Sequence, residues 1–140
     1  MTLNSAKWLL ATIWLVGGGL VFLLLVGGSI GNRYDPNVQD AWGWFLPTVM
    51  PTLLLIVGVL VADHQTEAAA DQAARPVAGR LLWLGATLSV VYLVLVALSV
   101  LIPAFWTHIS PLELMQRSNL WLGPLQGLTA AVLAAFFRGR

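Results

Sequence analysis

The most polar side chains within the long apolar segments of this chain are one glutamine and three threonines. Gln126 and Thr129 lie nearly one helical turn apart in the last apolar segment, and Thr48 and Thr52 lie at a similar depth in the second. Prolines close by in both segments remove backbone N–H donors and so leave carbonyl oxygens free. We therefore expect a candidate polar seam formed by these four residues. The simpler alternative is that they bind one another or the proline-kinked backbone.

Reactive groups are otherwise scarce. No Asp, Glu, Lys, Arg or His lies near the middle of an apolar segment, whereas an ionisable residue at that depth is the usual mark of ion-coupled transport. Ser29, Ser89 and Ser99 have no base close in sequence, although folding can bring distant residues together. The chain has no cysteine, which excludes thiolate nucleophiles and cysteine metal sites. We therefore predict a protein that is not an enzyme and that uses no cofactor or metal ion.

Two clusters of charged residues lie outside the apolar segments. One cluster mixes both signs, which favours ion pairing over the capture of a charged ligand; it comprises Arg33, Asp35, Asp40, Glu113 and Arg117. The other follows the second apolar segment and comprises Asp63, His64, Glu67 and Asp71. His64 and Glu67 would share one helix face, but solvated helix charges are the commoner explanation than a metal site.

Composition places the chain in a membrane. Of 140 residues, 59% are hydrophobic and 9% are charged, whereas about a quarter of the residues of a soluble domain are charged. The net charge is +1 and the basic residues are scattered, which is not the pattern of a nucleic-acid-binding surface. The partners expected from composition are therefore the lipid bilayer and other membrane-spanning chains, and not nucleic acid.

Four apolar segments are long enough to cross a hydrocarbon layer of about 30 Å as helices. They cover residues 8–30, 42–61, 81–102 and 120–137. A helix satisfies its own backbone hydrogen bonds where water is absent. We therefore predict an all-α integral membrane protein of four transmembrane helices in one domain, 1–140. Its parts are a first hairpin over 1–62, a cytoplasmic connection over 63–79 and a second hairpin over 80–140.

Basic residues predict the orientation of the helices. One side of the membrane receives Lys7, Arg75, Arg80, Arg138 and Arg140, and the other receives only Arg33 and Arg117. By the positive-inside rule, both termini and the central connection face the cytoplasm, which we take to lie beneath a plasma (inner) membrane. Tryptophans agree, since Trp8 and Trp83 mark the inner interface and Trp42, Trp44, Trp106 and Trp121 the outer one. Trp14 lies deeper and is interpreted as a packing residue.

A short motif occurs once in each half of the chain. Asp35-Pro36 is followed by Trp44 and Pro47, and Ser110-Pro111 is followed by Trp121 and Pro124. The motif predicts helix starts near Pro36 and Pro111 and kinks at Pro47 and Pro124. A parallel pseudo-repeat of two hairpins, related by an axis along the membrane normal, would explain it. The ordinary placement of proline at helix starts and tryptophan at interfaces is the competing explanation.

Small residues recur every four positions in the last segment, at Gly123, Gly127, Ala131 and Ala135. Such a face lets another helix approach closely and predicts a helix-packing interface, either within the chain or between subunits. The function favoured by the sequence is a noncatalytic membrane assembly or accessory module, which forms an oligomer with itself or binds another membrane protein. The alternative is an oligomeric channel or a transporter of a small neutral solute.

Overall fold

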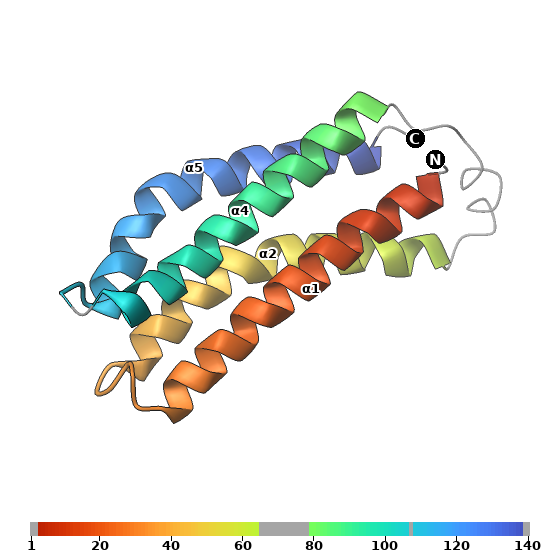
Figure 1. Cartoon of the computed structure of the whole chain (residues 1–140). Coiled ribbons are helices and arrows are strands. Elements are labelled where there is room, and N and C mark those ends of the chain that lie inside the picture. The colour runs from red at the N-terminus through yellow and green to blue at the C-terminus, as the bar shows by residue number, and fades with distance from the viewer. Residues whose placement is uncertain (1–2, 65–78, 107, 139–140) are drawn as a thin grey trace.

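The computed structural model describes residues 3–64, 79–106 and 108–138. Four α-helices make up nearly all of this part of the chain: α1 (Leu3–Ile30), α2 (Val38–His64), α4 (Gly79–Phe105) and α5 (Pro111–Arg138) (Figure 1). Each contains a stretch that is long and apolar enough to cross a membrane, and the described residues contain no strand. The predicted all-α membrane fold with four transmembrane helices is confirmed.

The helices are longer than the apolar segments that predict them. Each has 27 or 28 residues, which corresponds to a length of roughly 40 Å, against a hydrocarbon layer of about 30 Å. The excess is greatest in α5, which begins at Pro111 although the predicted apolar segment begins at Leu120. Residues 111–119, which include charged and polar side chains, therefore extend the helix beyond that segment.

The helices form a ring in which α1 and α4 run in one direction and α2 and α5 run in the other (Figure 1). In this ring α1 packs against α2 and α4, and α5 packs against the same two helices. The start of α1 and the end of α5 lie at one end of the bundle, and the end of α1 and the end of α4 lie at the other. A twofold axis along the bundle would place α1 and α4 at opposite corners, whereas they are neighbours. The predicted repeat and its axis are therefore not confirmed.

The starts of α2 and α5 differ. Pro111 is the first residue of α5, as the sequence predicts, and the Leu114 amide donates to the Ser110 carbonyl at 3.1 Å. Pro36, in contrast, precedes α2, which begins at Val38 after Asn37. The helices continue without interruption through the prolines within them, so the kinks stay a prediction.

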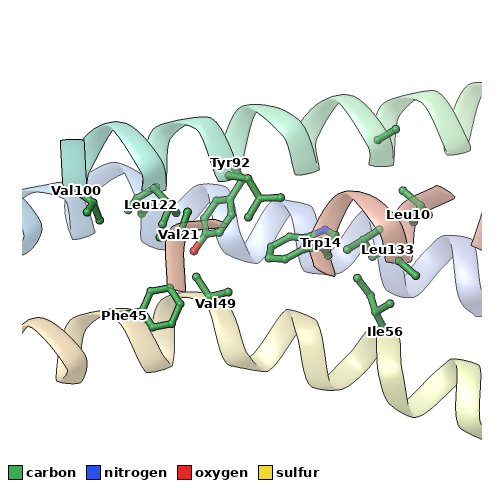
Figure 2. Close-up of a cluster of buried hydrophobic side chains, with 14 of the residues drawn as sticks. Leu10, Trp14, Val21, Phe45, Val49, Ile56, Tyr92, Val100, Leu122 and Leu133 are labelled. Atoms are coloured by element: carbon green, nitrogen blue, oxygen red, sulfur yellow. The ribbon is translucent and has the colours of Figure 1, made fainter. Parts of the chain in front are cut away.

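Large apolar side chains fill the interior of the bundle. Trp14 of α1, Phe45 of α2 and Tyr92 of α4 are fully buried near its middle (Figure 2). The rings of Trp14 and Tyr92 lie 5.7 Å apart, which confirms Trp14 as a packing residue. Leucines cover much of the outside, and the exposed fraction of Leu120 is 78%. This outer surface is compatible with contact to lipid.

Small residues of α1 and α4, rather than those of α5, allow close helix packing within the chain. A Cβ atom at Gly17 would lie 2.7 Å from the Leu93 side chain, and one at Gly85 would lie 3.6 Å from those of Val132 and Leu133. Gly17 therefore lets the Leu93 side chain of α4 approach α1 closely, and Gly85 lies at ordinary contact distance from α5. Ser89, one turn after Gly85, is fully buried as well.

Candidate helix interface and polar seam

The polar seam forms around a carbonyl oxygen that a proline leaves free. In a helix the Pro47 carbonyl would accept from the amide of residue 51, but Pro51 has no N–H. The Gln126 side chain of α5 supplies the missing donor, since its Nε2 lies 3.1 Å from the Pro47 oxygen and 3.2 Å from the Thr48 oxygen. Gln126 of α5 and the backbone of α2 are therefore joined by side-chain to backbone hydrogen bonds.

A third helix joins the seam through Tyr92. Its hydroxyl donates to the Thr48 carbonyl at 2.7 Å, and Figure 2 shows the hydroxyl pointing towards α2. The Thr48 carbonyl thus binds side chains from α4 and α5 together. Sequence reasoning missed Tyr92 because a lone tyrosine within an aliphatic run gives no sign of the acceptor that it reaches.

The threonines of the seam are turned towards their own helices. Thr48 Oγ1 donates to the Trp44 carbonyl, and Thr129 Oγ1 donates to the Leu125 carbonyl at 2.8 Å. Thr52 is buried on α2. The structure therefore brings Gln126 and the Thr48 backbone together but directs the hydroxyls of Thr48 and Thr129 elsewhere. Polar groups used in this way satisfy the backbone.

The small-residue face of α5, which we define as Gly123, Gly127, Ala131 and Ala135, lies on the outside of the bundle. All four residues are exposed. A Cβ atom at Gly123 or Gly127 would meet nothing within 4 Å. The face therefore takes no part in packing within the chain.

A hollow of about 390 Å³ lies beside the small-residue face, between α2 and α5. Gly123, Gly127 and Ala130 form its α5 wall, and Pro51, Thr52 and Leu55 form its α2 wall. Gln126 lies between the two walls. The hollow and the face together give this side of the bundle a concave surface, on which the small residues of α5 lie opposite Pro51, Thr52 and Leu55 of α2.

The hydroxyls of three serines bind the backbone of their own helices. Ser29, Ser89 and Ser99 each donate to the carbonyl four residues earlier, at 2.7 to 2.9 Å. In residues 3–64, 79–106 and 108–138, no group of three His, Asp or Glu residues could hold a metal ion.

Ser118, which the sequence did not single out, accepts a hydrogen bond of 3.2 Å from the indole of Trp44. Trp44 is thereby buried, whereas Trp106 and Trp121 are exposed as interfacial residues would be.

The structure describes the residues of the first charged cluster but not the side chains of the second. Arg117 and Glu113 form an exposed ion pair of 2.6 Å along α5, a type of contact that contributes little to stability. Asp35 and Asp40 are exposed. Of the other cluster, Glu67 and Asp71 lie outside the described residues, as do the side chains of Asp63 and His64.

Comparison with protein-family models, with curated proteins and with solved structures finds no match to this chain.

Proposed function

We propose that the protein is a noncatalytic membrane assembly or accessory module, which associates with another membrane-spanning chain through the small-residue face of α5. The observation that carries this proposal is the exposure of all four residues of the face. In lipid, apolar side chains gain nothing by leaving the solvent, so helices associate where small residues allow close backbone contact. An outward face of this kind is suited to receiving a helix of a second chain.

The neighbouring hollow supports the same interpretation. It lies alongside Gly123 and Gly127, so a helix placed on the face could extend a side chain into it. The partner is either a second copy of this chain or a different membrane subunit. The orientation that we propose places both termini in the cytoplasm, on the basic side of the chain.

Neither catalysis nor transport gains comparable support. The serine hydroxyls donate to their own helices, and the middle of the bundle is filled by Trp14, Phe45 and Tyr92. The strongest polar group of the seam, Gln126, already binds two backbone carbonyls. A water-filled path through a single bundle would have to displace these contacts.

Cross-linking in native membranes tests the proposal. The chain has no cysteine, so Ala131→Cys provides a single thiol on the face for attachment of a photoreactive benzophenone. Gly19→Cys is the matched control, because Gly19 is exposed on α1 with open space around it. We expect a discrete cross-linked product from Ala131→Cys alone. Twice the protomer mass would identify a second copy, and another mass a different subunit. No product, or the same product from both variants, would contradict the proposal.

A further inference from the structure

A long apolar groove of about 770 Å³ runs between α1 and α4, on the side of the ring opposite the small-residue face. On α1 it extends from Thr12 to Leu24, and on α4 from Val90 to Leu101. Apart from Thr12 its lining residues are apolar. Twelve residues of helix rise by about 18 Å, which exceeds half of a hydrocarbon layer of ~30 Å. The groove therefore has the length and chemistry to hold one acyl chain of one leaflet.

The turn after α1 folds back against this helix at Gly28. Gly28 lies one turn beyond Leu24, about 6 Å further along α1. The Arg33 amide donates to the Gly28 carbonyl at 3.0 Å, which holds the turn against the helix. A Cβ atom at Gly28 would lie 2.6 Å from the Tyr34 ring and 2.9 Å from its hydroxyl. Glycine at this position therefore makes room for Tyr34 beyond the end of the groove.

Two buried donors at this turn have no acceptor. The Arg33 Nη2 atom and the Tyr34 hydroxyl are both enclosed, and neither has a hydrogen-bond partner among the described residues. Enclosed donors of this kind call for an acceptor, and a cation paired with a hydroxyl suits an oxyanion. The exposed Asp35 makes no bond to this Nη2 atom. The guanidinium also lies close enough to Tyr34 to lower the pKa of its phenol, against the larger effect of burial, which raises it.

The position of the turn indicates which oxyanion is at hand. The apolar span of α1 ends at Ile30, so a bilayer placed around this span would have its phosphates near Arg33 and Tyr34. Arg33 is only partly buried as a whole, and its long side chain can turn towards a headgroup without unfolding the turn. The groove and the donor pair are therefore at the correct depths to bind two parts of one molecule.

We infer that the α1–α4 side of the bundle binds one phospholipid, with an acyl chain in the groove and the headgroup phosphate on Arg33 and Tyr34. Phosphate accepts from guanidinium and hydroxyl donors alike. The acyl chain makes the apolar contact along α1 and α4, and the phosphate supplies the hydrogen-bond acceptor that the turn lacks. This lipid site is separate from the small-residue face of α5.

Lipid retention by the purified protein tests this inference. The probe is dioleoylphosphatidylglycerol, with dioleoylglycerol as the lipid without phosphate and inorganic phosphate as the anion without chains. Native mass spectrometry counts the bound molecules. We expect one retained phospholipid, with Arg33→Gln and Tyr34→Phe each lowering retention by about tenfold, because a charge-assisted or buried hydrogen bond is lost. Arg117→Gln is the matched control, since Arg117 is exposed and paired with Glu113.

A second pair of variants tests the groove. Val94→Phe fills the groove, whereas Val91→Phe places the same ring on an exposed site of α4 outside it. Only the first should lower phospholipid retention, and both should keep the melting temperature of the lipid-free protein. If Arg33→Gln loses its fold, Tyr34→Phe keeps the test, because it removes one hydroxyl and retains the ring.

Several results would overturn the inference. Equal phospholipid retention by Arg33→Gln and Arg117→Gln would contradict the proposed phosphate contact. Binding of dioleoylglycerol as tight as that of dioleoylphosphatidylglycerol would contradict it too. Equal phospholipid retention by Val94→Phe and Val91→Phe would contradict the placement of an acyl chain in the groove. Binding of inorganic phosphate as tight as that of the phospholipid would show a free-anion site, and no retained lipid would show that water alone satisfies the two donors.

Discussion

The Gln126 side chain of α5 takes the place of the backbone donor that Pro51 removes from the Pro47 carbonyl of α2, at a distance of 3.1 Å. A proline within a membrane helix leaves an acceptor that water cannot reach, so a neighbouring helix has to satisfy it. Here the acceptor and its replacement donor come from different hairpins. The pairing therefore fixes the position of α5 relative to α2 and, with it, which face of α5 points outwards.

Replacing Gln126 with leucine should destabilise the protomer. The variant removes both hydrogen bonds to α2 and leaves the Pro47 carbonyl without a donor, which costs about 0.6 to 1.7 kcal/mol for interhelical contacts in membranes. The free energy of unfolding in detergent micelles measures the loss. Gln116→Leu is the control, because Gln116 is exposed on the same helix. Equal stability of the two variants would contradict the role of Gln126.

Tyr92→Phe should be coupled energetically to Gln126→Leu. The two side chains donate to one acceptor, the Thr48 carbonyl, and residues that share a partner show non-additive effects of at least about 0.5 kcal/mol. The double variant should therefore lose a different amount of unfolding free energy from the sum of the single losses. A double-mutant cycle measures the difference. Strict additivity would mean that the two donors act independently.

Tyr34 should ionise at an unusually high pH. Burial raises the pKa of its phenol above the ordinary value of 10.0, and the Arg33 charge partly opposes this effect. A group whose pKa is raised by folding stabilises the fold below its unfolded pKa and loses that contribution as the pH rises through the folded pKa. The chain has two tyrosines, so in a Tyr92→Phe background the phenolate absorbance reports Tyr34 alone.

That titration has a built-in comparison. Arg33→Gln should raise the pKa of Tyr34 further, because it removes the neighbouring positive charge. Unfolding in detergent should return the pKa of Tyr34 towards its ordinary value. A midpoint at or below pH 10 in the folded protein, where the ordinary value is 10.0, would contradict the burial of this hydroxyl.

Single cysteines should report the orientation of the bundle. Asn37 is exposed in the turn before α2, and Gln72 lies in the connection outside the described residues. A membrane-impermeant thiol reagent added to intact cells should label Asn37→Cys and should reach Gln72→Cys only after permeabilisation. Labelling of both cysteines from outside would contradict the four-span topology. Labelling of Gln72→Cys alone in intact cells would show that the orientation is the opposite of the predicted one.

The sequence predicts the membrane fold well because apolar length alone decides it. Four runs of sufficient length leave helices as the natural way to satisfy the backbone, and a proline at position 111 fixes the start of α5. The polar seam was also foreseeable, since Gln126 and the prolines of α2 are exceptional within their segments. A proline leaves a carbonyl oxygen of its own helix without an N–H donor, and a glutamine side chain can supply one.

Features that depend on how helices rotate against one another could not be predicted. Each helix is apolar on nearly all sides, so periodicity does not distinguish a lipid-facing side from a buried one. The sequence therefore left open whether the Gly127 face packs within the chain. Trp44 and Trp121 look equivalent in sequence, yet only Trp44 is buried, because Ser118 of α5 accepts its indole N–H. Tyr34 gave no signal, since its burial depends on the turn over Gly28.

The assembly proposal makes its sharpest prediction at Gly127. Because nothing lies within 4 Å of a Cβ atom there, Gly127→Leu should leave the thermal stability of the protomer unchanged. It should nevertheless break association through the face, since overpacking a close contact costs about 1 to 3 kcal/mol. Gly19→Leu, on the open side of α1, should change neither property. Gly85→Leu should destabilise the protomer itself, because Gly85 is buried and a Cβ atom there already lies in contact with Val132 and Leu133, which leaves little space for the rest of a leucine side chain.

The deciding measurement is the mass of the complex extracted from native membranes in mild detergent, compared between Gly127→Leu and Gly19→Leu. The account predicts that Gly19→Leu keeps the wild-type mass and that Gly127→Leu yields a folded protomer of lower mass. An unchanged complex in the Gly127→Leu variant, with an unchanged melting temperature, would show that the small-residue face of α5 meets only lipid and would contradict the proposed function.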